Sequence, residues 1–178
     1  DTASATNYQL TGLTAYNLYD FYVQADCGAA NGVSAWVGPL SFTTSCVAGQ
    51  IPFNEGFENG YAHDDILAGC WTHEAVSGTS PWTVNETNVN YNRTPRTGDF
   101  NIHLRYSNER WMFYPLELNA GETYELSFYA RQDATSGAEV EAAFGTADNA
   151  AAMTSSIIPP TAVVNGDYQE FIGFFTPS

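Results

Sequence analysis

Alternation of apolar and polar residues with a period of two runs through most of this 178-residue chain, and it constrains the fold more than any other feature. In the segment YDFYVQAD, Tyr19, Phe21 and Val23 fall on one side of an extended backbone and the residues between them fall on the other. The same alternation recurs in FNIHLRYS, TYELSFYAR and EVEAAFG. Such segments are typical of half-buried antiparallel strands, so the sequence predicts an all-β fold.

Helical periodicity is nearly absent from the chain. The one helix candidate is ADNAAAMTSS, residues 147–156, for which a polar loop is an equal alternative.

The charge of the chain excludes two classes of partner. Twenty acidic residues stand against five basic ones, all arginine, which gives a formal net charge of -15. Such a chain cannot neutralise the phosphates of a nucleic acid or of an anionic membrane surface. No apolar run reaches the roughly 18 residues that a membrane span needs, so we expect no membrane insertion. Amides, hydroxyls and aromatics dominate the remaining composition, which favours a secreted or cell-surface protein.

The pattern changes near Cys46, and residues 1–46 predict three strands in NYQLTGL, YNLYDFYVQAD and SAWVGPLSFTTS. The spacing from Leu13 to Tyr19 fits a tyrosine corner, in which the phenol hydroxyl bonds back to the main chain. This segment resembles the last three strands of a fibronectin type III domain. The resemblance implies that the first half of that domain lies upstream.

Residues 47–178 resemble the jelly-roll modules of the MAM and cleaved-adhesin type found on proteins secreted by Bacteroidota. The matching features are Cys46, GFEN at 56–59, CW at 70–71, Trp82, TGDF at 97–100, and the segment WMFYPLELNAGETYELSFYAR. The resemblance implies a jelly-roll β-sandwich whose last strands are missing. We therefore expect a partial fibronectin type III sandwich followed by a jelly roll, both truncated, in an extracellular multidomain protein.

The resemblance also implies a disulfide between Cys46 and Cys70, and a partner for Cys27 in the absent upstream half. The alternative is three free, buried thiols.

Calcium is the cofactor that the resemblance implies, because Glu58 and Asp99 match positions that hold calcium in similar jelly rolls. Glu55 and oxygens around Asn59 could complete the six to eight oxygen ligands that calcium prefers. The alternative is a set of solvated acids at strand ends.

Aromatic and arginine side chains are the best candidates for ligand binding, since flat rings contact the apolar faces of sugars. We assign the ligand-binding role to Tyr91, Arg93, Arg96 and Trp82, and note as further candidates Tyr106, Trp111, Arg105 and Arg110. Four of the five arginines lie between 93 and 110. The alternative is that Trp71, Trp82 and Trp111 belong to the core.

Catalytic motifs are absent, and His63, His73 and His103 have no identifiable partners at ligand or triad spacing. The sequence therefore predicts a non-catalytic extracellular adhesion or glycan-binding module, whose partners are surface glycans, host or neighbour-cell proteins, and neighbouring domains of its own chain. Two alternatives stay open: a structural spacer in a repetitive surface adhesin or filament, and an accessory domain of a secreted peptidase or glycosidase.

Overall fold

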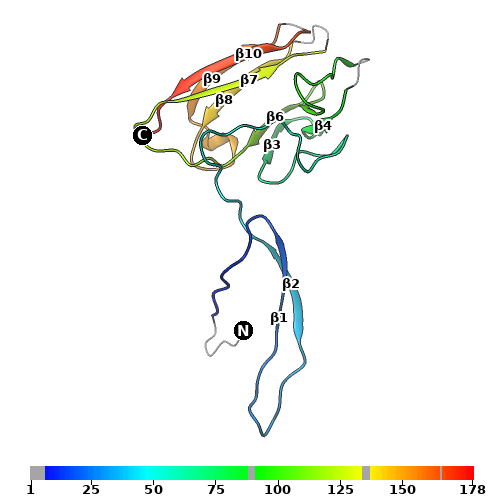
Figure 1. Ribbon diagram of the computed structural model, residues 1–178, viewed down its shortest axis with the longest axis vertical. Helices are drawn as coiled ribbons and strands as arrows, with labels where there is room; N and C mark the ends of the chain where they lie inside the picture. The colour runs from blue at the N-terminus through cyan, green and yellow to red at the C-terminus, as the bar shows by residue number, and fades with distance from the viewer. Residues whose placement is uncertain (1–6, 88–90, 134–136, 165) are drawn as a thin grey trace. The chain divides into compact units, whose positions relative to one another are not determined.

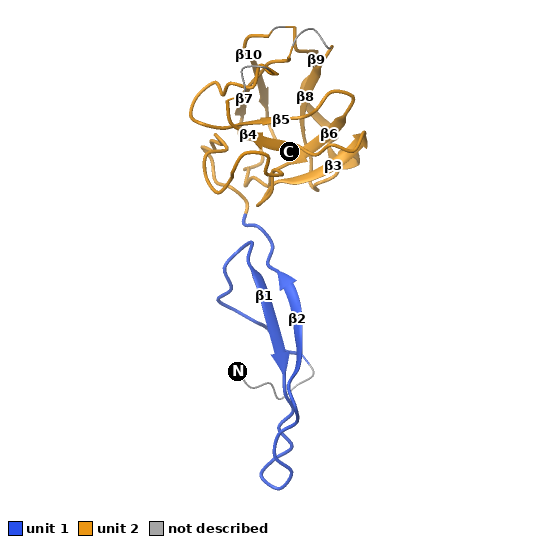
Figure 2. Ribbon diagram, turned by 90° about the vertical axis from the view of Figure 1, so that its right-hand side faces the viewer, with its two compact units in different colours: residues 1–47 blue, residues 48–178 orange. Residues whose placement is uncertain are grey.

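The computed structural model describes residues 7–87, 91–133, 137–164 and 166–178. The chain divides into two compact units, residues 1–47 and 48–178, which Figure 2 colours separately. The regular elements that the structure describes are β-strands together with short 3-10 structure such as Ala150–Ala152, so the all-β prediction is confirmed. The division lies between Val47 and Ala48. The assignment of the first unit to a fibronectin type III domain stays a prediction.

The first unit is built on one antiparallel hairpin, β1 (Leu18–Val23) and β2 (Val37–Thr43). The Tyr19 hydroxyl accepts a hydrogen bond from the Thr14 backbone N–H at 2.9 Å, which confirms the tyrosine corner. The expectation of a third strand before it was wrong for the described residues, because 7–17 carry no strand.

One face of this hairpin is apolar and uncovered. Tyr19 pairs with Phe42 and Phe21 pairs with Leu40, so that their side chains lie together on that face. Leu40 is 61% exposed, and none of the described residues of this unit is buried. A two-stranded sheet without a covering layer is marginally stable in water.

The second unit contains eight of the strands that the structure describes (Figure 1). They are β3 (Thr72–Ser77), β4 (Thr83–Asn85), β5 (Asn101–His103), β6 (Glu109–Phe113), β7 (Tyr124–Ala130), β8 (Glu139–Phe144), β9 (Ser155–Ala162) and β10 (Gln169–Phe175). The pairings between these strands are antiparallel, and they join β3 to β6, β4 to β5, β7 to β10, and β8 to β9. The 3-10 helix η2 (Ala150–Ala152) lies within the segment where a helix was one of two expectations.

Two predicted strands differ in how well they agree with the structure. Strand β7 covers the alternating segment that the sequence indicated, and its odd-numbered residues face outward. The alternation after Phe100, by contrast, forms a strand only as far as His103. The chain then turns, and Ser107 adopts a φ of 58°, which a strand does not allow.

The core of the second unit lies where β7 and β10 pack against β8 and β9. Its buried centre is Ile158, Val163 and Phe171. Gly173 permits the close approach of β9, because a Cβ at this position would lie 2.6 Å from the Ile157 Cγ2.

Strand β9 was not predicted, and it contains Pro159 and Pro160, which are unusual inside a regular strand. The structure places them at a register shift: Ile158 pairs with Ala142, whereas Thr161 pairs with Val140.

Cys46 and Cys70 are disulfide-bonded, which confirms the predicted bridge. A disulfide that closes a loop of about two dozen residues stabilises the folded state by about 3 kcal/mol in the chain-entropy account. Cys27 is a free and exposed thiol in this chain.

Candidate functional site

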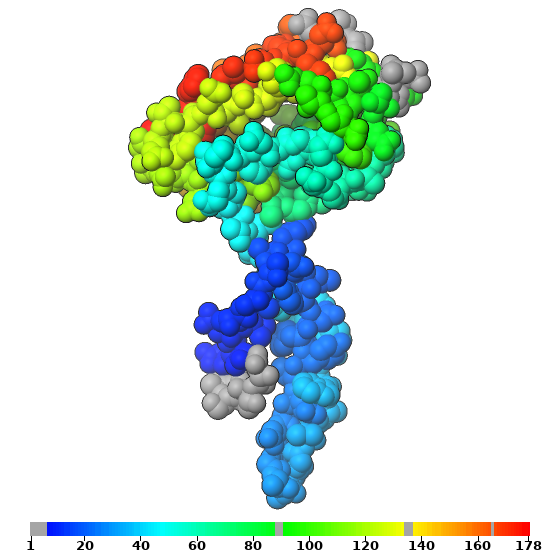
Figure 3. Space-filling model, viewed as in Figure 1, coloured from blue at the N-terminus to red at the C-terminus, as the bar shows by residue number. Residues whose placement is uncertain are grey.

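A hollow opens on one face of the second unit, between three segments that are distant in the sequence. Figure 3 shows it between the cyan segment that begins this unit, the green loop that precedes β5, and the yellow-green strand β7. These segments cover residues 48–60, 91–100 and 115–130. Hydrogen bonds and ring contacts join each of them to the next.

The first join links segment 48–60 to the chain before β7. The Gly49 N–H donates to the Pro115 carbonyl, and the Glu117 N–H donates to the Gly49 carbonyl, each at 2.9 Å. The Gln50 Nε2 also donates to the Glu117 Oε2 at 2.6 Å. The Phe53 ring centroid lies 4.4 Å from that of Tyr114, which fixes the segment against the core.

The second join links segment 48–60 to loop 91–100 through Glu58. Its carboxylate accepts hydrogen bonds from the backbone N–H groups of Asp99, at 3.1 Å, and Phe100, at 3.3 Å. Gly98 leaves room for this contact, because it has a φ of 68° and a Cβ there would collide with the Glu58 Oε1. Glu55 makes a local bond instead, accepting from the Phe57 N–H at 2.6 Å.

The predicted calcium ligands are thus only partly brought together. Glu58 meets the backbone at Asp99, whereas Glu55 and Asn59 lie exposed in the same loop. Within the described ranges, no group of three or more His, Cys, Asp and Glu side chains lies close enough to hold a metal ion. Calcium also accepts carbonyl and amide oxygens, so the calcium site stays a prediction.

The third join links loop 91–100 to β7 and β10 through an arginine on a tyrosine. The Arg96 Cζ lies 3.5 Å from the ring centroid of Tyr129. The Tyr129 hydroxyl donates to the Glu170 Oε1 at 2.5 Å, directly across the β7–β10 pair. This hydrogen bond is the main reason why the pKa of Tyr129 is raised. Tyr129 is 37% exposed, so part of its ring faces solvent beside the Arg96 guanidinium.

A second arginine-tyrosine pair holds the same loop in place. The Arg131 Cζ lies 4.4 Å from the Tyr168 ring centroid. Both side chains donate to the Thr94 carbonyl, the tyrosine hydroxyl at 3.1 Å. Asn92 adds donations to the carbonyls of Gln132 and Gly166. Loop 91–100 is therefore anchored on the residues just after β7 and just before β10.

Arg93 points into the protein rather than to the hollow. Its Nη1 donates to the Oδ1 of Asn85, a fully buried residue, at 3.1 Å. The Asn85 Nδ2 lies 2.8 Å from the Nδ1 of His103. Burial first, and then the Arg93 charge, lower the pKa of His103. Arg93 thus stabilises a polar network below the loop, while Tyr91 remains 54% exposed with its ring 5.0 Å from the Arg93 Cζ.

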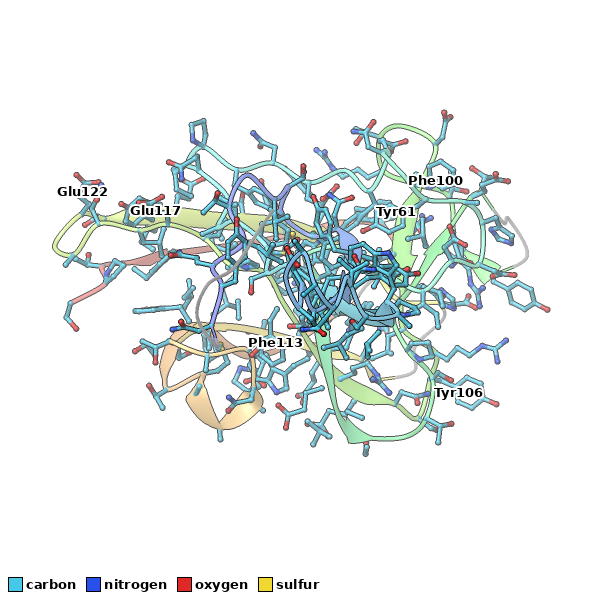
Figure 4. All side chains as sticks on the ribbon, turned by 90° about the horizontal axis from the view of Figure 1, so that it is seen from below. Tyr61, Phe100, Tyr106, Phe113, Glu117 and Glu122 are labelled. Carbon is cyan, nitrogen blue, oxygen red and sulfur yellow. The ribbon has the colours of Figure 1, made fainter. Side chains whose placement is uncertain are left out.

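Three further aromatic candidates differ in their surroundings. Trp82 is half-buried, and its indole N–H donates to the Arg110 carbonyl at 3.1 Å. The Trp111 ring stacks on Phe113 with centroids 6.1 Å apart. Tyr106 is 85% exposed and points outward, away from segment 48–60, in Figure 4.

A polar pocket of about 250 Å³ lies where segment 48–60 meets the start of β7. Its lining residues are Gln50, Ile51, Glu117, Asn119, Glu122 and Tyr124. Figure 4 shows Glu117 and Glu122 near one another at this end of the unit.

Sequence reasoning missed Tyr129, Glu170 and this pocket. A signal for Tyr129 existed, because it is the one aromatic residue on the polar side of the alternating segment 124–130. An aromatic ring on a solvent-facing side of a strand is a feature of ligand sites as well as of chance exposure.

The small antiparallel sheets of the second unit are consistent with a β-sandwich module. The chain belongs to the carbohydrate binding domain family, whose model matches residues 49–178. No curated protein and no solved structure gave a match. The predicted non-catalytic glycan-binding module is therefore confirmed. The finer resemblance to MAM-like and cleaved-adhesin modules stays a prediction.

Proposed function

We propose that the glycan binds in the hollow of the second unit, with Tyr129 as its main contact. The observation that supports this is the contact of the partly exposed Tyr129 with both Arg96 and Glu170. Sugar rings have apolar C–H faces that pack on aromatic surfaces, and their hydroxyls need donors and acceptors beside those surfaces. Arg96 supplies N–H donors and Glu170 supplies carboxylate acceptors. Arg96 and Glu170 each contact Tyr129 directly, so donors and acceptors lie beside the ring.

Affinity measurements on single variants test this placement. Calorimetric titration of the 178-residue chain would use soluble xylan, mixed-linkage glucan, mannan, laminarin and pectate. Tyr129→Ala should weaken binding of the best ligand by about tenfold or more, since an aromatic contact and its ordered neighbours contribute roughly 1.5 kcal/mol or more. Arg96→Ala should weaken it in the same direction.

Tyr106→Ala is the matched control, because Tyr106 is an exposed tyrosine outside the hollow. Equal affinity of Tyr129→Ala and the parent chain would contradict the placement. Tyr91→Ala tests the other exposed predicted tyrosine, for which we expect a smaller loss. We expect no direct ligand role for Arg93 and Trp82, whose polar groups bond to the protein.

The module would act outside the cell as part of a larger protein. A disulfide and a glycan-binding family are compatible with an extracellular location, and no helix in the described part of the chain is both long and apolar enough to span a membrane. We propose that it attaches its parent protein to surface glycans, as an adhesin or as an accessory domain of a secreted hydrolase. A spacer without ligand is disfavoured by the family. Finding a catalytic domain in the full-length sequence would favour the role of accessory domain of a secreted hydrolase over that of adhesin.

We also propose a structural calcium ion at the corner formed by Glu58 and the Asp99 loop. The Glu58 carboxylate, the Asp99 carboxylate and neighbouring carbonyls are hard oxygen ligands of the kind that calcium takes. Melting with excess calcium and with chelator tests it. At 100 times the dissociation constant, a bound ion stabilises by about 2.7 kcal/mol. An unchanged melting temperature would remove calcium from this corner.

A further inference from the structure

We infer that Arg93, Asn85 and His103 form an acid-sensitive switch, which holds loop 91–100 in place while His103 is neutral and releases Arg93 when His103 takes up a proton. Its effect on ligand affinity rests on the proposed function, because the glycan is placed beside this loop. The inference adds the regulation of that site: the affinity is high at neutral pH and falls in acidic surroundings.

The direction of each hydrogen bond in this network follows from its chemistry. A guanidinium can only donate, so the Asn85 atom that lies 3.1 Å from the Arg93 Nη1 is the acceptor Oδ1. The Nδ2 of the same amide lies 2.8 Å from the His103 Nδ1. An amide NH2 group also can only donate, so Nδ1 accepts and the proton of the neutral ring is on Nε2. Arg93 and neutral His103 therefore match the two ends of one amide.

A second proton on the His103 ring breaks this match. With a proton on Nδ1, that N–H and the NH2 group of Asn85 face each other as two donors across 2.8 Å. The Thr83 Oγ1 lies 2.7 Å from Nδ1 and can accept the new proton, but the NH2 group still faces an N–H. Rotation of the amide by half a turn gives His103 an acceptor and turns the NH2 group towards Arg93. Asn85 can thus accept from Arg93 or from protonated His103, but not from both.

Arg93 is the member of the network that is free to leave. Asn85 is fully buried, and His103 is part of strand β5. Arg93 is half-buried and belongs to a loop. Because a guanidinium and an imidazolium at the two ends of one buried amide repel each other, the departure of Arg93 also relieves a like-charge contact.

The charges around His103 couple its protonation to the release of Arg93. Burial lowers the pKa of His103 most, and the Arg93 charge is the next cause. Arg105, from the chain after β5, lowers this pKa as well, whereas a bond with Thr83 and the charge of Asp64, from the chain before β3, raise it. Departure of Arg93 removes the largest charge effect, so proton uptake and loop release favour each other by linkage.

The loop carries this change to the proposed ligand contact. The Arg93 carbonyl accepts from the Asn101 Nδ2 at 2.7 Å, so the backbone at Arg93 lies directly on β5. Arg96 follows three residues later and packs on the Tyr129 ring. Asn92 and Thr94 keep their own bonds to the protein, so we expect a shift of the loop and not its complete release.

An NMR titration of the free 178-residue chain tests the switch without any ligand. The ring resonances of His103 and the backbone amides of loop 91–100 should shift with one common midpoint, below about pH 6.5, the ordinary value for histidine. Loop amides that stay unchanged while the ring titrates would overturn the inference. A ring that stays neutral until the chain unfolds would overturn it as well.

Variants at the two ends of the network test the coupling. His103→Asn keeps an uncharged acceptor near the position of Nδ1, so its loop amides should not respond in the pH range where those of the parent do. Arg93→Gln removes the cation, and the midpoint of His103 should rise towards its ordinary value. Arg110→Gln is the control, because Arg110 is not among the charges that act on His103. An unchanged midpoint in Arg93→Gln would contradict the coupling.

Affinity at two pH values separates this inference from the proposed function. Soluble xylan, mixed-linkage glucan, mannan and laminarin are titrated into the parent and His103→Asn, at neutral pH and below the His103 midpoint. The parent's affinity for the best of these should fall by about fivefold or more, as is typical of coupled sites, and that of His103→Asn should fall less. If the loop follows His103 while the affinity is constant, the switch stands and the placement of the glycan is wrong. If the loop does not follow His103, the switch is wrong, and the placement depends on Tyr129→Ala alone.

Discussion

At the scale of single residues, the polar network of Asn85, Arg93 and His103 below loop 91–100 contains one buried nitrogen without a hydrogen-bond partner among the described residues. Asn85 is fully buried and bonds to Arg93 and His103. The His103 Nε2 is buried and has no hydrogen-bond partner among the described residues. A second proton on this ring would therefore place a charge in a half-buried site next to a guanidinium.

The folded protein should lose stability on acidification through His103. Its pKa is lowered in the folded state by burial and by Arg93. Below its ordinary pKa of about 6.5 the unfolded chain takes up a proton that the folded chain does not, so stability falls as pH drops from neutral. Above that pH the ring is neutral in both states and contributes no pH dependence. Urea unfolding at neutral and mildly acidic pH measures the difference.

His103→Gln should lose less stability between those two pH values than the parent chain. If His103→Gln lost as much stability between the two pH values as the parent chain does, His103 would not be the titrating group.

At the scale of elements, one of the contacts that hold loop 91–100, the Glu58 contact, depends on a glycine. Gly98 has a positive φ, and a methyl group on it would meet the Glu58 carboxylate. Gly121 also has a positive φ, of 81°, but a methyl group there would meet no atom within 4 Å. Substitution of Gly121 thus tests backbone strain alone, whereas substitution of Gly98 tests backbone strain together with a steric clash.

Gly98→Ala should destabilise the second unit by more than Gly121→Ala does. Both carry the cost of a left-handed alanine, which is about 1 kcal/mol or more. Gly98→Ala must also displace Glu58 from the N–H groups of Asp99 and Phe100, with a further loss of about 1.5 kcal/mol or more. Thermal melting of the two variants gives the comparison, and equal melting temperatures would show that Glu58 moves aside freely.

Elements with a clear alternation could be predicted from sequence, whereas contacts between loops could not. Strand β7 follows from its own residues, since every second side chain is apolar and packs inward. The pairing of Arg96 with Tyr129 depends on where the loop folds back, and neither residue's neighbours in sequence carry that information. The cluster of arginines indicated the loop. It did not indicate that Arg93 bonds to the buried Asn85 while Arg96 packs on Tyr129.

At the scale of the whole molecule, the two units differ in what they bury. The second unit has a core around Ile158, Val163 and Phe171. The described part of the first unit has no buried residue, and its hairpin leaves Val37 and Leu40 more than half exposed. Stability within one chain can vary from near zero to the global value, and it follows buried contacts.

Hydrogen exchange should therefore separate the units. Amides of β1 and β2 should exchange far faster than those of β7 and β10 in the 178-residue chain at low concentration. Peptide-resolved exchange followed by mass spectrometry measures this. Slow exchange in β1 and β2 that persists on dilution would contradict the expectation.

The placement of the arginines makes a common protease a reporter of the hollow. The chain has no lysine, and its five arginines lie between 93 and 131. Trypsin can therefore cut only within this stretch, and residues 1–93 remain one fragment. Two of the five bonds follow Arg96 and Arg131, whose guanidinium groups hold loop 91–100 on its neighbours. The rate of cleavage after Arg96 and Arg131 therefore reports how stably loop 91–100 is held on its neighbours. A glycan that fills the hollow would slow this cleavage, which a gel would show as protection of the intact chain.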